Sequence, residues 1–293
     1  MFSQKQASHS AARRSIGARR LSSREAKMPV LSTGRFDINY IEEGEGFPIL
    51  LVHGLAGDHT AWLPQIAAWK DRYRVIAFDN PGSGDSSLVG EPTGTADLAD
   101  ATLGLMDKLG IEKAHVVGRS MGGAVAQHMA LKSPKRLQSL AMAASFARLD
   151  SVGAQVIANL QQLLKWRGNW AEWAPHAVYL FVAPAFYNDN PELMSRITAL
   201  VSDDGRDMAS YDHLATACLE HDVLDRLSDI QIPTLVMGGR FDPICSMTAQ
   251  SWMMDRLPNA ELAVFEQSSH FFLMEEAAKA MSTLENWFEK HAA

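Results

Sequence analysis

The chain has 293 residues, of which 47% are hydrophobic and 21% are charged, and its formal net charge at pH 7 is −7. This composition is typical of a globular protein that buries a core of its own, so folding requires neither a metal nor a disulfide framework. The acidic balance argues against nucleic acid or an anionic membrane as the main partner, and no apolar run reaches the ~20 residues that a membrane helix needs.

The first 27 residues differ from the rest in composition. They are rich in Ser and Ala and carry one acidic residue, Glu25, beside Arg13, Arg14, Arg19, Arg20 and Arg24. This composition resembles that of a transit peptide and lacks the apolar stretch of a secretory signal. We interpret residues 1–27 as a disordered or non-native tail of a cytoplasmic protein. Organellar targeting is the alternative, and Met28 is a candidate translation start.

From Arg35 onward, patterns of strands and helices alternate. Phe36, Ile38 and Tyr40 alternate with polar residues, as in a half-buried strand. Continuous apolar runs, typical of central parallel strands, occur at 48–52, 74–78, 114–117, around 140, at 234–237 and at 262–265. Helical patterns lie between them at 60–70, 95–109 and 120–132. This order predicts an α/β fold with a parallel sheet covered on both faces by helices.

The alternation stops between about Ala147 and Leu227. This stretch is helical in pattern and rich in aromatic residues, namely Trp166, Trp170, Trp173, Tyr179, Phe181, Phe186 and Tyr187. We expect a helical cap at 147–227, inserted into an α/β core formed by 28–146 and 228–293. The three tryptophans are spaced by four and three residues, which predicts that they share one helical face packed against the core.

The segment Gly118-Arg119-Ser120-Met121-Gly122 follows a predicted strand and opens a predicted helix. In this context G-x-S-x-G forms a sharp turn that lifts the serine hydroxyl above the edge of the sheet. The helix N-terminus also favours negative charge that develops beside the serine. Ser120 is therefore the predicted nucleophile.

A nucleophilic serine needs a base, and the base needs an orienting acid. His270 lies five residues beyond the predicted strand that ends at Phe265, on the same edge of the sheet as Ser120. Asp242 follows the predicted strand 234–237, and the order Ser, Asp, His suits this architecture. Asp242 could instead cap the helix that begins near residue 246. The other acid at a strand end, Asp79, precedes Ser120 in the chain.

Two backbone N–H groups are expected to form an oxyanion hole. One belongs to Met121, directly after the nucleophile. The other belongs to Leu55, after the turn His53-Gly54, where the glycine lets the backbone approach closely. His53 is expected to hold this loop in place rather than to exchange protons.

Taken together, these motifs resemble those of the α/β-hydrolase family. The matching segments are His53-Gly54, Asp79-Asn80-Pro81-Gly82-Ser83-Gly84-Asp85-Ser86, the turn at Ser120, Asp242 and His270. The resemblance implies a mostly parallel eight-stranded sheet flanked by helices, with a helical cap insertion. Within the family the chain is most similar to small esterases, 3-oxoadipate enol-lactonases and aminoacrylate hydrolases. It implies a small ester or lactone as substrate, with no metal or organic cofactor.

Two residues have both a structural and a functional interpretation. Arg119 adjoins the nucleophile and either forms a buried ion pair with Asp79 or Asp85 or contacts a substrate carboxylate. Trp166 either packs in the core of the cap or walls the substrate pocket.

Metal binding is not expected from this sequence. The two cysteines, Cys218 and Cys245, lie far apart and in no metal-ligand spacing, which indicates two reduced thiols. His221 and Asp222 lack further ligands at a suitable spacing.

Other functions fit the same motifs. A carbon–carbon bond hydrolase of ring-fission products and a cofactor-free perhydrolase share the predicted triad. A ligand-sensing receptor on a hydrolase fold is the alternative from a different class. Fold alone does not choose between them, and the sequence leaves open whether the protein is a monomer or a homo-oligomer.

Overall fold

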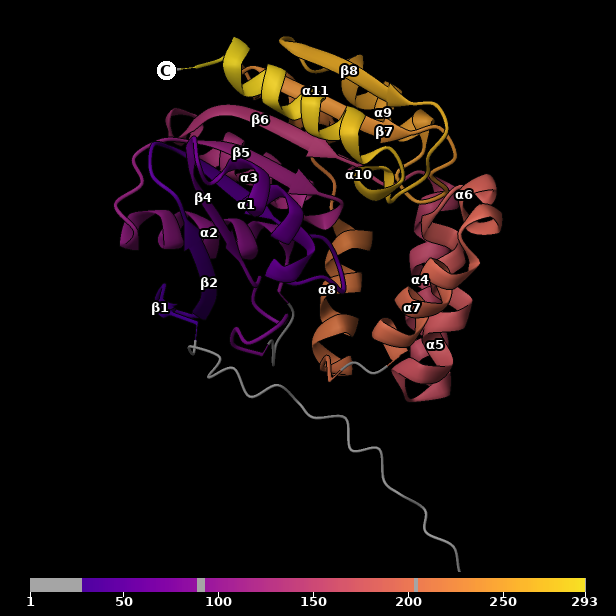
Figure 1. Cartoon of the computed structure of the whole chain (residues 1–293). Helices are drawn as coiled ribbons and strands as arrows, with labels where there is room; N and C mark the ends of the chain where they lie inside the picture. Colours follow the sequence, from indigo (N-terminus) through magenta and orange to yellow (C-terminus); the bar gives the residue numbers. More distant parts are fainter. Residues whose placement is uncertain (1–27, 89–92, 203–204, 293) are drawn as a thin grey trace, which may run out of the picture.

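A computed structural model describes residues 28–88, 93–202 and 205–292 of the chain. The predicted tail at 1–27 lies outside these residues. Eight strands form one sheet in the order β1-β2-β4-β3-β5-β6-β7-β8. The strands β3 to β8 pair in parallel, whereas β1–β2 and β2–β4 are antiparallel. The predicted eight-stranded, mostly parallel sheet is thus confirmed (Figure 1).

The strands are β1 (Val30–Ser32), β2 (Asp37–Glu43), β3 (Phe47–Val52), β4 (Tyr73–Phe78), β5 (Ala114–Arg119), β6 (Leu137–Ala143), β7 (Thr234–Gly239) and β8 (Ala260–Phe265). The helices of the core are α1 (Leu63–Trp69), α2 (Thr95–Lys108), α3 (Met121–Lys132), α9 (Met247–Met254), α10 (Phe272–Glu275) and α11 (Ala277–Lys290). Between β6 and β7 lie α4 (Ser151–Arg167), α5 (Trp170–Ala177), α6 (Pro184–Asp189), α7 (Pro191–Ser202) and α8 (Met208–Glu220). The short 3-10 helices η1 (His59–Trp62) and η3 (Val178–Phe181) join neighbouring elements.

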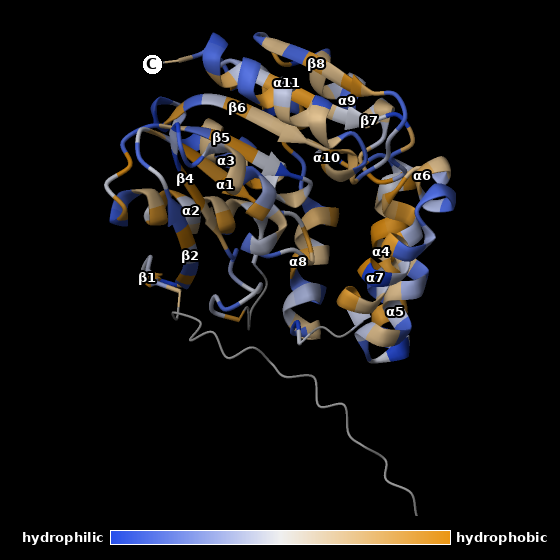
Figure 2. Cartoon of the chain, viewed as in Figure 1, coloured by the Kyte–Doolittle hydropathy of each residue, from blue (hydrophilic) through white to orange (hydrophobic). Residues whose placement is uncertain are grey.

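The sheet separates two hydrophobic cores, because successive side chains of a strand point to opposite faces. On one face, Trp62, Trp69, Trp287 and Phe288 of α1, α11 and η1 pack with alternate strand residues. On the other face, α2 and α3 pack together and extend this core toward the cap helices. The strands β5 and β6 are drawn mostly in hydrophobic colours, whereas α11 alternates between hydrophobic and hydrophilic (Figure 2).

The insertion between β6 and β7 contains no strand among its described residues, in keeping with the predicted cap at 147–227. Figure 1 shows α4, α5, α6 and α7 gathered on one side of the sheet. The helices α4 and α8 pack together, as do α5 and α7. No helix within the described ranges is long and apolar enough to cross a membrane. The division into a core at 28–146 and 228–293 and a cap stays a prediction.

Two local differences from the expected elements have physical causes. The predicted helix at 60–70 starts later, at Leu63, because the Asp58 side chain accepts the N–H of Thr60 and begins a 3-10 turn first. The strand β1 was not predicted, since only three residues pair with β2 and such a short edge carries no periodic pattern.

The packing of α11 gives a stability prediction. Phe288 is 1% exposed, and its ring meets those of Trp69 and Tyr73 with centroids 5.2 and 5.8 Å apart. We expect Phe288→Ala to lower the free energy of unfolding by about 3–5 kcal/mol, because it leaves a cavity in the core. Urea denaturation would measure this loss. The matched control Val152→Ala, at a residue that is 61% exposed, should change stability by less than about 0.5 kcal/mol. Equal effects of the two changes would contradict the packing described here.

Candidate active site

Ser120 occupies a sharp turn between β5 and α3. Its φ of 53° and ψ of −122° are values that residues other than glycine rarely adopt. The turn passes very close to β3, since a Cβ on Gly122 would lie 2.1 Å from the carbonyl oxygen of Val52. The N–H of Ser120 donates to the carbonyl of Ala143 at 2.9 Å, which ties the turn to β6. The surrounding backbone therefore holds Ser120 in its unusual conformation.

His270 and Asp242 come from the loops after β8 and β7, at the same edge of the sheet. Nδ1 of His270 donates to Oδ2 of Asp242 at 2.8 Å. A carboxylate only accepts, so Nδ1 carries the proton and Nε2 is left as an acceptor. Oδ1 of Asp242 accepts the N–H groups of Ile244 and Cys245 at 2.8 and 2.9 Å. The carboxylate is therefore fixed in orientation and directed at His270.

The helix after this loop does not use Asp242 as its cap. Ser246 occupies the N-cap of α9, and its hydroxyl accepts the N–H of Ala249 at 3.2 Å. Ser246, and not Asp242, therefore caps this helix.

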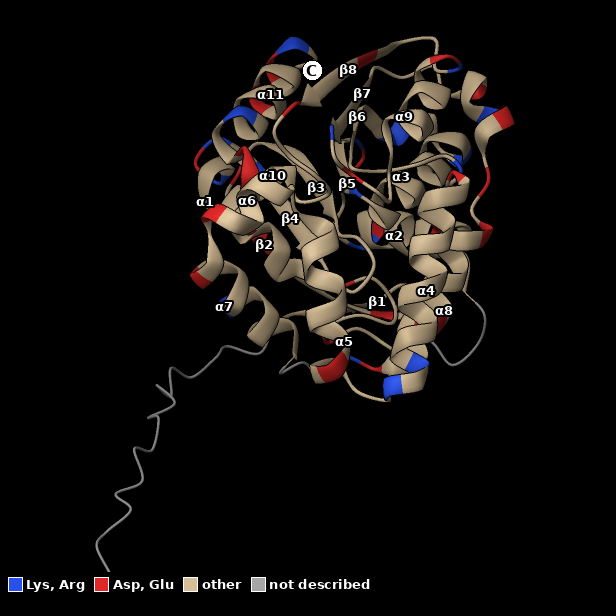
Figure 3. Cartoon of the chain, turned by 90° about the vertical axis from the view of Figure 1, so that its right-hand side faces the viewer, with Lys and Arg blue, Asp and Glu red and all other residues tan. Residues whose placement is uncertain are grey.

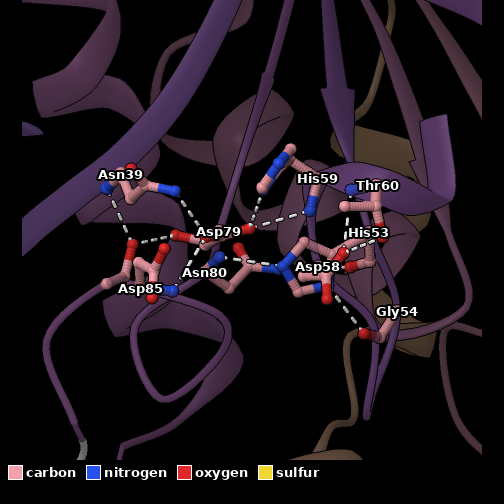
Figure 4. A network of polar contacts seen from close by, with 10 residues as sticks. Asn39, His53, Gly54, Asp58, His59, Thr60, Asp79, Asn80 and Asp85 are labelled. Carbon is pink, nitrogen blue, oxygen red and sulfur yellow. Dashed lines mark hydrogen bonds and ion pairs between the residues drawn. The ribbon is translucent and has the colours of Figure 1, made fainter. Parts of the chain in front are cut away.

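Asp79, the rival carboxylate, is committed to a separate network (Figure 4). Oδ1 accepts the N–H and Nδ1–H of His59, both at 2.8 Å. Oδ2 accepts from Nδ2 of Asn39 at 2.7 Å and from the N–H of Asp85 at 3.0 Å. Burial raises the pKa of Asp79, but these hydrogen bonds outweigh it and lower the pKa to about 2. The bond to Asp79 in turn raises the pKa of His59 above its usual 6.5.

The loop after β3 is held in place through His53 (Figure 4). Nε2 of His53 accepts the N–H of Asn80 at 2.9 Å, so Nδ1 donates to the carbonyl of Gly54 at 2.8 Å. Burial lowers the pKa of His53, which keeps the ring neutral for this pair of roles. A Cβ on Gly54 would lie 2.9 Å from Cβ of Ser120. His53 therefore positions the loop, as expected from the sequence.

The two residues predicted to form an oxyanion hole lie next to Ser120. Met121 is the first residue of α3, and the opening N–H groups of a helix have no acceptor within it. Leu55 belongs to the loop that approaches Ser120 and lines the same cavity. This arrangement suits the stabilisation of negative charge beside the serine.

Ser120 and His270 line one cavity of about 110 Å³ between the core loops and the cap. The cap contributes a mostly apolar wall, formed by Trp173, Val178, Phe181, Ile197 and Val201. A smaller hollow of about 40 Å³ adjoins the same two residues and is lined on its far side by Ile157, Leu160, Tyr211 and Ile244. A molecule bound at Ser120 would occupy a small, largely apolar space.

The cap is joined to the loop that follows β8. The N–H of Phe271 donates to the carbonyl of Phe181 at 2.8 Å, and the two rings stack with centroids 5.1 Å apart. The carboxylate of Glu275 accepts the N–H of Ser269 at 3.0 Å and the N–H of Ala183 at 2.7 Å. One carboxylate thus connects the cap to the segment that carries the histidine.

Arg119, at the end of β5, lines this cavity without forming the predicted ion pair. Asp79 has the other partners described above, and no ion pair among the described residues joins Arg119 to it or to Asp85. The guanidinium carbon instead lies 4.6 Å from the centre of the Phe271 ring, and Nε is buried without a hydrogen-bond partner. Burial lowers the pKa of Arg119 to about 10, partly offset by the charge of Asp242.

Trp166 is not part of this site. Its side chain is 78% exposed and lines neither cavity at Ser120. The chain turns at Gly168, whose φ is 71°, and a new helix starts after Asn169. The three tryptophans therefore do not share one helical face, as the spacing had predicted. Trp173, on the second helix, lines the cavity instead.

Several residues of the site escaped the sequence analysis. Asn39 had a detectable signal, since it is a polar residue beside buried Ile38 in a strand. His59 opens the short helix η1 and Arg206 lies outside regular structure, so no periodic pattern marks either residue.

Two groups of potential metal ligands occur among the described residues, Asp58-His59-Asp79 and Asp242-Cys245-His270. In each group the histidine Nδ1 bonds an aspartate oxygen at 2.8 Å, so neither needs an ion to explain its placement. Cys245 is a buried free thiol, and burial raises its pKa.

Comparisons with known proteins agree with this architecture. Residues 48–277 match the family model described as "alpha/beta hydrolase fold". The chain is 28% identical over 251 residues to "Putative carbamate hydrolase RutD" of Azorhizobium caulinodans, with 84% of this chain and 92% of the relative covered. It is 29% identical over 241 residues to 3-oxoadipate enol-lactonase 1 of Acinetobacter baylyi, with 79% and 84% covered.

Among solved structures, a thermophilic esterase from Thermogutta terrifontis, with malate bound, is similar at a TM-score of 0.79. The two sequences are 26% identical, and the match covers 91% of this chain and 98% of the esterase.

The pair of His59 and Asp79 predicts a pH-dependent stability. The folded pKa of His59 is raised above 6.5, so its contribution is complete below pH 6.5 and is lost as the pH rises through the folded pKa. The folded pKa of Asp79 is lowered from 3.8 to about 2, so its contribution is complete above pH 3.8 and is lost as the pH falls through about 2. We expect the stability advantage of wild type over His59→Asn to be largest between pH 4 and 6 and to shrink toward pH 9. Urea denaturation across this range would measure it, and a constant difference would contradict the assignment.

The burial of Arg119 predicts that replacing it with an apolar residue stabilises the protein. A cation held in a largely buried position without a hydrogen-bonded partner opposes folding, so an apolar side chain of similar length should be better tolerated. We expect Arg119→Met to raise the free energy of unfolding by about 1–2 kcal/mol, after the loss of the contact with Phe271. Thermal and urea denaturation would measure the change, and a marked fall in stability would show that Arg119 supports the fold.

Proposed function

The chain belongs to the α/β-hydrolase family, and from this premise we propose that it is a serine hydrolase of small carboxylic esters or lactones. In this proposal Ser120 is the nucleophile, His270 the general base and Asp242 the acid that orients the base. The N–H groups of Met121 and Leu55 form the oxyanion hole.

In the first step, Nε2 of His270 takes the proton of the Ser120 hydroxyl as the oxygen attacks the substrate carbonyl. Asp242 accepts from Nδ1 of His270 at 2.8 Å and stabilises the imidazolium that forms. The carbonyl oxygen becomes an oxyanion that the two N–H groups bind. When the tetrahedral intermediate collapses, His270 gives the proton to the leaving alcohol and an acyl group remains on Ser120.

In the second step, His270 takes a proton from water, and the hydroxide attacks the acyl carbonyl. The same N–H groups bind the new oxyanion. The intermediate then releases the carboxylic acid and returns the proton to Ser120. A lactone follows the same path, except that the alcohol and the acid leave as one hydroxy acid.

One observation carries this proposal. Ser120 sits at φ 53° on the edge of the sheet and shares its cavity with His270, whose Nδ1 bonds the fixed carboxylate of Asp242. A strained serine conformation that serves only the fold would not need a histidine–carboxylate pair at its side. The small apolar cavity favours short acyl groups, and the enol-lactonase and esterase relatives support the choice of an ester or lactone.

A carbamate is the second candidate substrate, because the first of the relatives named above carries a carbamate hydrolase name. Its carbonyl carbon would meet the same nucleophile and the same oxyanion hole. Carbamates are less electrophilic than esters, so the same site would cleave them more slowly.

We expect the wild type to hydrolyse p-nitrophenyl acetate and butyrate, and Ser120→Ala to lose at least about 10³-fold in kcat. His270→Ala should lose a similar factor, and Asp242→Asn should lose about 10²- to 10⁴-fold, because the histidine would take the wrong tautomer. Mass spectrometry of protein quenched during turnover should find the acyl group on Ser120. An aryl carbamate assayed in parallel would rank the second candidate.

The matched control is Ser282→Ala, at an exposed serine of α11, which should keep full activity. If the folded wild type hydrolysed no ester, lactone or carbamate, the proposal would be wrong. Assays for carbon–carbon bond hydrolysis, for peracid formation and for ligand retention would then separate the remaining alternatives.

A further inference from the structure

The cavity at Ser120 is lined by a buried guanidinium, that of Arg119, directly beside the serine. Of the described residues that line it, two are arginines, Arg119 and Arg206, and none is an Asp or Glu. The whole chain has a net charge of −7, and charges of both signs are spread over its outer elements (Figure 3). The guanidinium of Arg119 favours an anionic occupant, because it attracts negative charge to the space beside Ser120.

No ion pair within the described part of the chain joins Arg119 to Asp242. The charge of Asp242 raises the pKa of Arg119, but less than burial lowers it. Its two oxygens already accept from His270, Ile244 and Cys245. Because those bonds orient the base, Asp242 cannot turn toward Arg119 without giving them up.

The position of Arg119 also suits a ligand. The guanidinium lies over the ring of Phe271 at 4.6 Å, which holds it beside the cavity, and Nε is buried without a hydrogen-bond partner. A guanidinium presents several donors in a planar fork that matches the two oxygens of a carboxylate. An oxyanion in the cavity would accept hydrogen bonds from the Arg119 guanidinium, for which the described residues provide no acceptor.

Arg206 brings a second cation to the cavity from the cap. Its guanidinium carbon lies 5.3 Å from the centre of the Trp170 ring, and its backbone carbonyl accepts the indole N–H of Trp170 at 2.9 Å. The residue lines both the cavity at Ser120 and a neighbouring cavity of about 690 Å³. Arg206 therefore lies at the border between the two cavities.

We propose that the substrate is a monoanion, a short ester or lactone that carries a carboxylate, and that Arg119 binds this carboxylate while Arg206 adds to the attraction. This inference rests on the proposed hydrolase function and names the class of its substrate. Arg119 adjoins Ser120 in the chain, and the cavity measures only about 110 Å³. The carboxylate and the scissile carbonyl are therefore separated by a few bonds.

The test compares charged esters with neutral esters of the same shape. Ethyl hydrogen succinate is paired with ethyl levulinate, and 4-acetoxybutanoate with 5-acetoxypentan-2-one, so that the carboxylate lies on the acyl side in one pair and on the alcohol side in the other. The quantity measured is the ratio of kcat/KM, charged over neutral. In the wild type we expect a ratio above ten for at least one pair, which should fall at least tenfold in Arg119→Met and partly recover in Arg119→Lys.

Arg206→Met should lower the same ratio by a smaller factor, mainly through KM. The matched control Arg72→Met removes an exposed arginine that pairs with Glu289, and it should leave the ratio unchanged. A wild-type ratio near one for both pairs would overturn the proposal. An equal loss of kcat/KM on charged and neutral esters in Arg119→Met would also overturn it. That result would mean that Arg119 positions Asp242 and does not bind the substrate carboxylate.

A binding measurement separates this inference from the hydrolase proposal. Thermal denaturation of Ser120→Ala with and without succinate monoamide, a small monoanion, should show a stabilisation that disappears in Ser120→Ala/Arg119→Met. The neutral succinamide should give no stabilisation in either. Stabilisation by the anion without any ester turnover would support the anion site while the hydrolase proposal fails. Ester turnover without stabilisation and without a charge preference would leave the hydrolase proposal standing and overturn this one.

Discussion

The close approach of two backbone segments at the carboxyl edge of the sheet is the constraint on which the rest of the site depends. The turn at Gly122 passes so near β3 that a Cβ there would meet the Val52 carbonyl at 2.1 Å, and Gly54 leaves only enough room for Ser120. Because one contact is with a backbone carbonyl and the other with a Cβ, neither can relax by side-chain rotation. They fix the distance between Ser120 and the loop that we propose supplies an oxyanion donor.

The two carboxylates that follow β4 and β7 at this edge, Asp79 and Asp242, differ in their partners. Asp79 uses both oxygens on His59, Asn39 and the Asp85 N–H, and it supports the loops. Asp242 uses one oxygen on two backbone N–H groups and keeps the other for His270. The environment of a carboxylate, more than its place at the end of a strand, thus decides whether it serves the fold or orients a base.

Much of this arrangement was predictable because it follows from local patterns. The apolar runs, the glycine-flanked turn at Ser120 and the loops after the last two strands depend on short segments, and the parallel topology then brings their ends together. The surroundings of Arg119 were not predictable. An ion pair with Asp79 depends on which other groups already donate hydrogen bonds to that carboxylate, and the sequence does not show these groups. The predicted position of Trp166 is wrong because the helix ends at Gly168. The spacing of the tryptophans assumed one continuous helix across this glycine. Contacts between distant segments, such as Glu275 with Ala183, leave no signal in a single sequence.

The cap and the core contribute differently to the site, and the difference has a physical basis. Bond-making residues need positions fixed within about half an ångström, which the interlocked loops of a rigid sheet supply. Selection of a substrate tolerates more movement, because apolar contact and charge act over longer distances. Trp173 and Arg206 of the cap can therefore shape the cavity without disturbing the proposed triad. Arg119 is the exception, since it belongs to the rigid edge and directly precedes Ser120, the proposed nucleophile. A charge held there without a hydrogen-bonded partner opposes folding, and the anionic substrate that we propose would offset this cost when it binds beside Ser120.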